Sequence, residues 1–253
     1  MHALCTLFVF CVLTSFGGKA LGSEIINGKK TQKRSMKYMA SVQNNLQHIC
    51  GGFLISEEFV LTAAHCAERN PSRVVLGTHN LKKMNDTMKY EVKKMCKHPS
   101  YVNVSSGKDI MLLKLSKKAR VGKRKISLIK LPNKKMNLKD NKKCLVAGWG
   151  LTETNGQMVD DLRVVEVPII NLEKCQKLWR KLPGHVICAG GYGTKNGICQ
   201  GDSGGPLVCD KKAVGVVSYN RGYHCDYPDI PNIYTDIFTY LPWVKKILKE
   251  NDC

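Results

Sequence analysis

Residues 201–206 of the chain read Gly-Asp-Ser-Gly-Gly-Pro, with the serine at position 203. A serine between small residues on a tight turn leaves its hydroxyl exposed, and neighbouring backbone N–H groups can then point at a bound substrate. A serine hydroxyl is a weak nucleophile unless a base removes its proton. The stretch therefore indicates a nucleophilic Ser203 and requires a histidine near it in the fold.

The histidine with the most informative context is His65, in the stretch Thr-Ala-Ala-His-Cys at residues 62–66. An acid must fix the tautomer of its imidazole, and Asp109 is the best candidate because it opens the apolar stretch 109–113. A lone carboxylate at the edge of an apolar strand is costly without a partner. The other candidates are expected on the surface or in loops: His48, His79, His98, His185 and His224.

Composition narrows the class of protein. The chain has 253 residues, with 40 Lys or Arg against 20 Asp or Glu, so its formal net charge is +20. Hydrophobic residues make up 43% of it, which suffices for a sizeable core and excludes disorder, collagen and a membrane protein with several spans. Its 12 cysteines show no C-x-x-C spacing and therefore indicate disulfides formed in an oxidising compartment.

The amino terminus predicts secretion. Residues 4–16 form one apolar run without charge, and a small-x-small pattern follows at 20–22. The run is shorter than the roughly 20 residues of a membrane span. We therefore expect a signal peptide over 1–22 and no span in the mature protein, although a retained anchor stays open because no Lys or Arg precedes the run. Asn85 and Asn103 stand in sequons and would then be glycan acceptors.

The remainder has no repeat, linker or low-complexity tract, and its short β-forming runs are separated by turn residues. Many short strands separated by turns predict an antiparallel sandwich or barrel. Only the end has a helical period, from Asp236 or Thr239 onward, with lysines in its last turns. The expected strands cover 38–42, 52–55, 73–76, 110–115, 144–148, 162–167, 206–208, 213–218 and 233–235.

The motifs TAAHC, DIMLLKL and GDSGGP, in the order His, Asp, Ser, resemble those of the chymotrypsin-like (trypsin-fold) serine proteases. The resemblance runs from Ile25 to about Ile247, nearly all of the mature chain. It implies an all-β fold of two six-stranded antiparallel Greek-key barrels with a C-terminal α-helix. It also implies a single peptidase domain over 25–253.

The resemblance assigns roles to the motif residues. It implies that Ser203 attacks the scissile carbonyl and that His65 acts as general base and then as general acid. Asp109 would orient the imidazole and accept a hydrogen bond from Ser218. The backbone N–H groups of Gly201 and Ser203 would form the oxyanion hole.

The segment before Ile25 resembles that of granzymes and mast-cell proteases. Ser23 and Glu24 would form an acidic activation dipeptide, which a dipeptidyl peptidase removes in those proteins. By the same resemblance, the new α-amine of Ile25 enters the core and pairs with Asp202. That ion pair would shape the oxyanion hole.

Eight cysteines match bridges of the resembled family. Cys96 and Cys253 are left over, and they could bridge within the chain, link two chains or stay free. We expect the bridge within the chain, because the C-terminal helix of the family packs on the first barrel. The implied bridges are Cys50–Cys66, Cys144–Cys209, Cys175–Cys188 and Cys199–Cys225.

The resemblance also places the pocket for the P1 side chain. Gly197 stands at the pocket floor, where trypsin-like enzymes carry Asp, so a basic P1 residue would lack a charge partner. We expect a small-to-medium apolar or uncharged P1 residue, with an aromatic or Leu preference as the alternative. A nearby acid, Asp226 or Asp229, could still reach a basic P1. Further pocket residues are Ile198, Gln200, Ser218, Tyr219, Asn220 and Asn232.

Positive charge is concentrated in two segments. Residues 108–143 hold 14 Lys or Arg against two acids, and residues 82–97 hold six Lys against two acids. Such charge attracts polyanions, and we expect a sulfated proteoglycan of a secretory granule as partner. Nucleic acid is less favoured because few aromatic residues stand among the lysines to stack on bases. No paired acids indicate a calcium loop in 78–90, so we expect neither metal nor cofactor.

Together these features predict a secreted or granule-stored serine endopeptidase of immune cells, similar to granzymes, that hydrolyses peptide bonds of protein substrates through an acyl-enzyme. The alternative is a cationic heparin-binding or antimicrobial protein on the same fold, with weak or no proteolysis. The intact set of His65, Asp109 and Ser203 favours the enzyme.

Overall fold

A computed structural model describes residues 25–32, 35–45, 47–122, 126–222, 224–225 and 229–253. The predicted signal peptide 1–22 and activation dipeptide 23–24 lie outside the described residues. Within the part that is described, none of the helices has the length and apolar character needed to cross a membrane.

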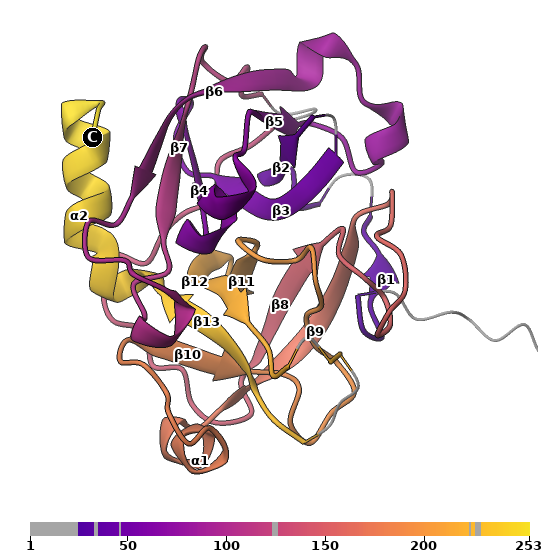
Figure 1. Ribbon diagram of the computed structural model, residues 1–253, viewed down its shortest axis with the longest axis vertical. Coiled ribbons are helices and arrows are strands. Elements are labelled where there is room, and N and C mark those ends of the chain that lie inside the picture. The colour runs from indigo at the N-terminus through magenta and orange to yellow at the C-terminus, as the bar shows by residue number, and fades with distance from the viewer. Residues whose placement is uncertain (1–24, 33–34, 46, 123–125, 223, 226–228) are drawn as a thin grey trace, which may run out of the picture.

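The first half of the chain forms a closed antiparallel barrel, drawn in indigo to magenta in Figure 1. Its order is β2-β3-β4-β7-β6-β5, and β5 pairs with β2 to close it. A fourth strand that returns beside the first is the Greek-key arrangement. The strands are β2 (Met39–Asn44), β3 (Gln47–Leu54), β4 (Phe59–Thr62), β5 (Arg73–Leu76), β6 (Lys89–Lys97) and β7 (Met111–Leu115).

The second half forms another closed barrel of the same kind, drawn in pink through orange to yellow. Its order is β9-β10-β13-β12-β11-β8, with β8 paired to β9, and β1 (Lys29–Lys30) extends it beside β9. Again the fourth strand, β11, lies beside the first, β8. The strands are β8 (Lys143–Gly148), β9 (Arg163–Ile170), β10 (Val186–Ala189), β11 (Pro206–Cys209), β12 (Lys212–Tyr219) and β13 (Asn232–Asp236). The predicted fold is therefore confirmed.

Each barrel is filled by the apolar side chains that the strand alternation turns inward. Phe53, Leu61 and Leu112 lie in the core of the first barrel, and Val146 and Leu207 lie in that of the second. All five are fully buried. Because burying such side chains contributes about 1.5–3 kcal/mol each, these two cores provide the main stabilisation of the fold.

The C-terminal helix α2 (Ile237–Glu250) is confirmed and begins directly after β13. Asp236 caps it, since its carboxylate accepts a 3.0 Å hydrogen bond from the Phe238 N–H. The buried side of the helix, including Leu241 and Val244, packs into the core of the first barrel. The second half of the chain thus reaches back to cover the first half, as Figure 1 shows.

Apart from short 3-10 helices, five described elements escaped the sequence analysis: β1, β4, β6, β10 and the short helix α1 (Leu172–Leu178). β6 carries four lysines, and only two of its nine residues are buried, so it lacks an alternating apolar signal. α1 depends on an Asn171 cap, whose side chain accepts hydrogen bonds from the first backbone N–H groups.

All four implied disulfides are present, and Cys96 bonds to Cys253 within the chain. The Cys96–Cys253 bridge joins the residues after α2 to β6. It is the bridge within the chain that we expected for these two cysteines. Lys94 and Asp252 form an ion pair of 2.9 Å beside this bridge. The C-terminal segment is therefore fixed to the first barrel at two points.

Candidate active site

His65 and Asp109 meet between the two barrels. His65 lies on a short 3-10 helix (Ala64–Arg69), and Asp109 lies two residues before β7. The imidazole Nδ1 is 2.8 Å from Asp109 Oδ2, and the His65 backbone N–H donates to Oδ1 at 2.9 Å. Because a carboxylate only accepts, Nδ1 carries a proton, so in the neutral form of the imidazole Nε2 has the lone pair. The structure therefore brings together the two residues that the sequence analysis paired.

The second barrel supplies further bonds to Asp109. The Ser218 hydroxyl donates to Oδ2 at 2.5 Å, and the Thr235 hydroxyl donates to the Asp109 carbonyl at 2.9 Å. Burial by itself would raise the pKa of Asp109, but the hydrogen bonds and charge of His65 and the bond from Ser218 outweigh burial and hold that pKa below its usual range. Asp109, with 1% of its side chain exposed, is therefore a buried anion.

Ser203 lies on the turn that precedes β11, partly exposed. Its carbonyl accepts a 2.7 Å hydrogen bond from the Gly51 N–H and lies 4.0 Å from Cys66 Sγ. The next residue, Gly204, has φ +82°, and a Cβ there would approach Thr62 Oγ1 to 2.1 Å. Only glycine allows this close approach. The turn thus rests on the segment that carries His65.

Asp202 is fully buried beneath the same turn. Its carboxylate accepts hydrogen bonds from the N–H groups of Gly150 and Cys199, both at 2.9 Å. Burial nevertheless raises its pKa to about 7. A Cβ at Gly148 or Gly150 would lie within 2.7 Å of Asp202 Oδ1, so both positions must be glycine to leave room for the carboxylate. Ile25, its expected partner, is fully buried in the core of the second barrel.

The expectation for His48 was wrong, because His48 belongs to β3 and reaches the site. Its Nε2 lies 2.9 Å from the Gly201 carbonyl, and its Nδ1 lies 2.8 Å from the Ser41 hydroxyl. A carbonyl only accepts, so Nε2 carries the proton and Ser41 donates to Nδ1. Burial lowers the pKa of His48 to about 4, which keeps the ring neutral. His48 therefore holds the turn that carries Ser203.

A sequence signal could have found His48. It stands two residues before Cys50, and the predicted bridge from Cys50 to Cys66 brings Cys50 close to His65. The other histidines fit the expectation better, since His185 and His224 are exposed outside strands and helices.

Among the expected pocket residues, the structure joins Ile198 to Asn232. Gly197 and Ile198 are buried, and the Ile198 N–H donates a 3.2 Å hydrogen bond to Oδ1 of Asn232. Asn220 donates to the His224 carbonyl at 3.0 Å. The Gln200 carbonyl accepts from the Leu151 N–H, which fixes the segment before the turn.

Trp179, which the sequence analysis missed, packs against Tyr219. The two rings meet edge to face with centroids 5.3 Å apart, and the indole N–H donates to the Pro231 carbonyl at 2.9 Å. Asp229 is exposed and lies 3.9 Å from Arg221, and Asp226 lies outside the described residues. Asp229, one of the two acids that could meet a basic P1 residue, is therefore at the surface and paired with Arg221.

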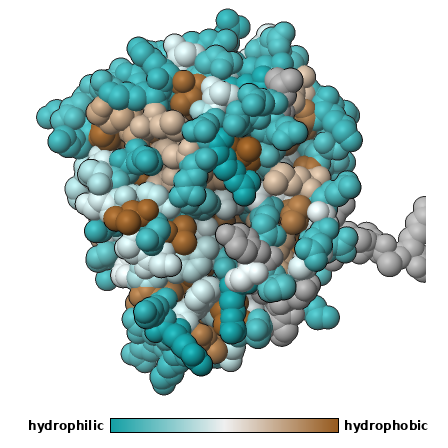
Figure 2. Space-filling model, in the orientation of Figure 1, coloured by the Kyte–Doolittle hydropathy of each residue, from teal (hydrophilic) through white to brown (hydrophobic). Residues whose placement is uncertain are grey.

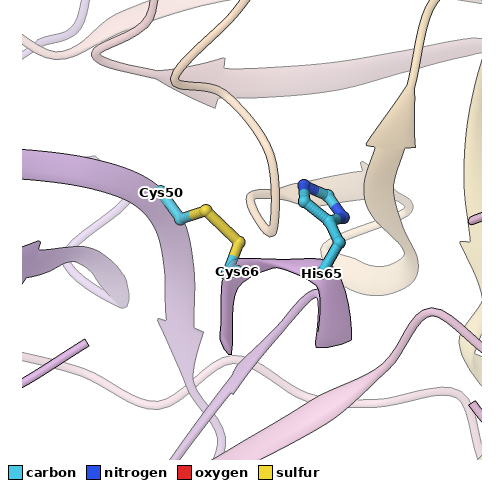
Figure 3. A group of neighbouring side chains, drawn as sticks. All are labelled: Cys50, His65 and Cys66. Carbon is cyan, nitrogen blue, oxygen red and sulfur yellow. A yellow bond between two sulfur atoms is a disulfide. The ribbon is translucent and has the colours of Figure 1, made fainter. Parts of the chain in front are cut away.

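Sulfur atoms lie close to His65, but they offer no thiolate to a metal. Figure 3 shows Cys66 beside His65 on the same short helix and bonded to Cys50 on β3. The three ligand atoms lie within 4.8 Å of one another. Because both sulfurs are used in the disulfide, this group fits a bridge that braces His65 rather than a metal centre.

Comparison with known proteins agrees with this geometry. The trypsin family model matches residues 25–244. Granzyme B(G,H) of Mus musculus is 38% identical over 97% of this chain and 99% of its own length. Mast cell protease 3 of Ovis aries is 38% identical over 96% of each chain.

Among solved structures, the serine protease neuropsin of mouse brain superposes with a TM-score of 0.79 at 33% identity, over 87% of this chain and 98% of neuropsin. The similarity to these serine proteases therefore extends over nearly the whole chain, including the residues that form the fold, the disulfides and the His65–Asp109 pair. This chain belongs to the trypsin family and is a serine endopeptidase.

Proposed function

We propose that this protein is a secreted or granule-stored endopeptidase, an immune-cell effector that cleaves protein substrates after an uncharged residue. The observation that carries the proposal is the hydrogen-bonded series from Ser218 through Asp109 to His65, beside the turn of Ser203. The alternative of a binding protein without proteolysis is not favoured, because such a protein does not need this buried anion and its imidazole.

The arrangement supports a triad mechanism. Ser203 Oγ attacks the scissile carbonyl while Nε2 of His65 accepts its proton. The buried Asp109 stabilises the imidazolium through the Nδ1–H bond of 2.8 Å. The imidazolium then protonates the leaving amine, and water hydrolyses the acyl-enzyme by the same sequence of proton transfers.

We place the oxyanion hole at the backbone N–H groups of Gly201 and Ser203. Gly201 has φ +95°, a conformation that an L side chain would strain, and its carbonyl bonds to His48. The hydrogen bond from His48 Nε2 therefore fixes the direction in which the Gly201 carbonyl points. Loss of one oxyanion donor typically lowers turnover by about 10²–10³-fold.

Activation in this proposal follows removal of Ser23 and Glu24 by a dipeptidyl peptidase. The buried position of Ile25 and the buried carboxylate of Asp202 support the pairing of the new α-amine with that carboxylate. An adjacent ammonium would lower the pKa of Asp202 from the value of about 7 that burial produces. Material that still begins at Ser23 is expected to lack peptidase activity.

The pocket supports a small-to-medium apolar or uncharged P1 residue. Gly197 offers no carboxylate at the floor, and the side chains of Asn220 and Asn232 reduce the room on the walls. An aromatic or Leu preference is the alternative. Fluorogenic peptides that differ only at P1 test this: faster cleavage after Arg or Lys than after Ala, Val or Met would reject the assignment.

We assign a sulfated proteoglycan as the storage or anchoring partner. The formal charge is +20, and Lys93, Lys94 and Lys97 on β6 are exposed. Hydrophilic residues dominate the face in view in Figure 2, and hydrophobic ones are scattered over it. Relatives named granzyme and mast cell protease support the immune-cell setting.

A fluorophosphonate probe tests the enzymatic proposal. After release of Ile25 as amino terminus, the protein should be labelled once, and Ser203→Ala should abolish labelling. Ser72→Ala, at an exposed serine outside the site, is the matched control and should label as wild type. Labelling that survives Ser203→Ala would contradict the assignment of the nucleophile.

A further inference from the structure

The two sequons of the chain lie in loops at opposite ends of β6 (Figure 1). Asn85 stands before this strand, and Asn103 follows it. A strand of nine residues spans about 30 Å, since each residue adds about 3.3 Å. Both side chains are exposed, and an exposed asparagine in a sequon of a secreted protein can carry an N-linked glycan. The two glycans would therefore stand in different surroundings.

The side chain of Asn103 has a fixed orientation. Its Oδ1 accepts a 3.0 Å hydrogen bond from the Ser106 N–H and so caps the 3-10 helix Val104–Ser106. Its Nδ2, the atom to which a glycan is attached, takes part in no hydrogen bond within the described part of the chain. Ser105, the third residue of the sequon, is exposed as well. A glycan can therefore be attached without breaking a contact of the folded loop.

The loop that follows β6, residues 98–108, borders the catalytic pair on the first barrel and leads directly into Asp109. Tyr101, near the start of the loop, packs against the core of that barrel. Burial raises the pKa of Tyr101, and the negative charges of Asp109 and Glu68 raise it further, so its phenol lies within electrostatic reach of both acids. Glu68 belongs to the 3-10 helix of His65. The start of the loop is therefore fixed beside the segment that carries the catalytic histidine.

The end of the same loop contacts the second barrel. A Cβ at Gly107 would lie 3.1 Å from Pro183 Cβ, so the two loops touch there. Leu182, next to Pro183, packs in one hydrophobic cluster with Tyr219, which is one of the expected pocket residues. The loop after β6 therefore reaches from the first barrel to the neighbourhood of the expected substrate pocket.

We propose that an N-linked glycan on Asn103 stands at the rim of the substrate cleft and selects substrates by their shape. Asn103 lies between Tyr101 and Gly107, the two points at which the loop is fixed, and its own side chain is exposed. A glycan is bulky. An extended peptide segment passes beside it to Ser203, whereas a folded protein surface collides with it. The inference rests on the secretion in the proposed function and adds a class of substrate, namely flexible or unfolded segments of proteins.

Asn85 offers a site of the same chemistry in another place. Its Oδ1 accepts hydrogen bonds from the Thr87 N–H at 3.1 Å and from the Thr87 hydroxyl at 2.7 Å, and it caps the 3-10 helix Asp86–Met88. This helix precedes β6, whereas the loop of Asn103 follows β6 and leads into Asp109. A glycan on Asn85 therefore adds similar bulk about one strand length away.

The test compares one cleavage sequence in two settings. A tetrapeptide is selected from a fluorogenic library for rapid cleavage by this enzyme, and the same four residues are placed in an exposed loop of a folded carrier protein. Ser105→Ala removes the sequon and leaves the Asn103 cap in place. In protein that is secreted by mammalian cells and begins at Ile25, this change should raise kcat/KM on the carrier by about fivefold or more, because a folded surface can then approach the rim. On the tetrapeptide kcat/KM should stay within about twofold of wild type.

The matched control is Thr87→Ala, which removes the other sequon at the same sequon position. It should leave kcat/KM on both substrates within about twofold of wild type. Ser105→Thr keeps the sequon and should behave as wild type. After removal of the glycans by peptide N-glycosidase, wild type and Ser105→Ala should cleave the carrier at equal rates.

Four outcomes would each overturn the inference. They are equal gains from Ser105→Ala and Thr87→Ala, no gain on the carrier, an equal gain on the tetrapeptide, and a difference between wild type and Ser105→Ala that persists after deglycosylation.

Mass spectrometry of the expressed chain separates this inference from the proposed function. A glycan on Asn103 of the exported chain is expected. Export of the chain without a glycan on Asn103 would reject the inference and keep the secretion that we propose. Retention of the chain in the cytosol would contradict both.

Discussion

The hydroxyl of Ser218 donates a 2.5 Å hydrogen bond to Oδ2 of Asp109, the oxygen that also contacts His65 Nδ1. Ser218 lies on β12 of the second barrel, whereas Asp109 precedes β7 of the first. The carboxylate therefore joins the two halves of the molecule at the site. The orientation of the Asp109 carboxylate, and with it the alignment of His65, therefore depends on how the two barrels pack against each other.

Ser218→Ala should lower kcat/KM by about tenfold, because the carboxylate loses a buried charge-assisted hydrogen bond and with it part of its alignment toward His65. Steady-state kinetics on a fluorogenic peptide measures the loss. Ser127→Ala, a partly buried serine in a loop, is the control. A Ser218→Ala enzyme within twofold of wild type would show that Asp109 is aligned without this bond.

Asp202 should make the stability of the uncleaved chain depend on pH. Its folded pKa of about 7 exceeds the reference value of 3.8, so between these values the folded state holds a proton that the unfolded state has released. The free energy of unfolding should then fall as pH rises from about 4 to 7, by up to about 4 kcal/mol from this group. Chemical denaturation at several pH values measures it.

Asp202→Asn should remove this contribution, whereas Asp229→Asn at an exposed carboxylate should leave it. Release of the Ile25 α-amine should also remove it, because an ammonium nearby favours the charged carboxylate. A pH dependence identical in wild type and Asp202→Asn would contradict the burial of an uncompensated carboxylate in the uncleaved chain. His48 contributes in the opposite direction, since its folded pKa is lowered, so the difference between variants is the relevant quantity.

Gly204→Ala should prevent folding or destabilise the protein by several kcal/mol. The new methyl would lie 2.1 Å from Thr62 Oγ1 and 2.5 Å from the Gly51 carbonyl, at φ +82°. Gly184→Ala is the matched control, because a Cβ at Gly184 meets nothing within 4 Å. Expression level and melting temperature report the outcome. A Gly204→Ala protein as stable as the control would mean that the turn is not packed as described.

Removal of the Cys96–Cys253 bridge should lower the free energy of unfolding by about 2–4 kcal/mol, since it closes the longest loop among the disulfides, with a sequence separation of 157. The double variant Cys96→Ser and Cys253→Ser avoids a free thiol. The corresponding removal of Cys175–Cys188, with a separation of 13, should cost less under the same loop-entropy argument. The reverse order of stabilities would contradict that argument for this chain.

Much of the fold follows from local pattern, and the exceptions have physical causes. The predicted runs at 73–76 and 110–115 coincide with β5 and β7 to within one residue because their apolar residues form the core of the first barrel. β6 could not be predicted, since its pairing with β5 and β7 holds a lysine-rich segment in extended form. Tertiary pairing there overrides local preference.

The site divides in the same way. His65, Asp109 and Ser203 stand in distinctive motifs, whereas His48 acts through a contact with Gly201, 153 residues away. Only its position two residues before Cys50 points to the site. Trp179 likewise gains its place beside Tyr219 only through packing.

Pre-steady-state hydrolysis of an activated ester tests the central claim most directly. Protein that begins at Ile25 should release a burst of one leaving group per molecule, followed by slower turnover, because Ser203 is acylated faster than water removes the acyl group. Peptide mapping should find the acyl group on Ser203. Turnover without a burst, or an acyl group on another residue, would contradict the account.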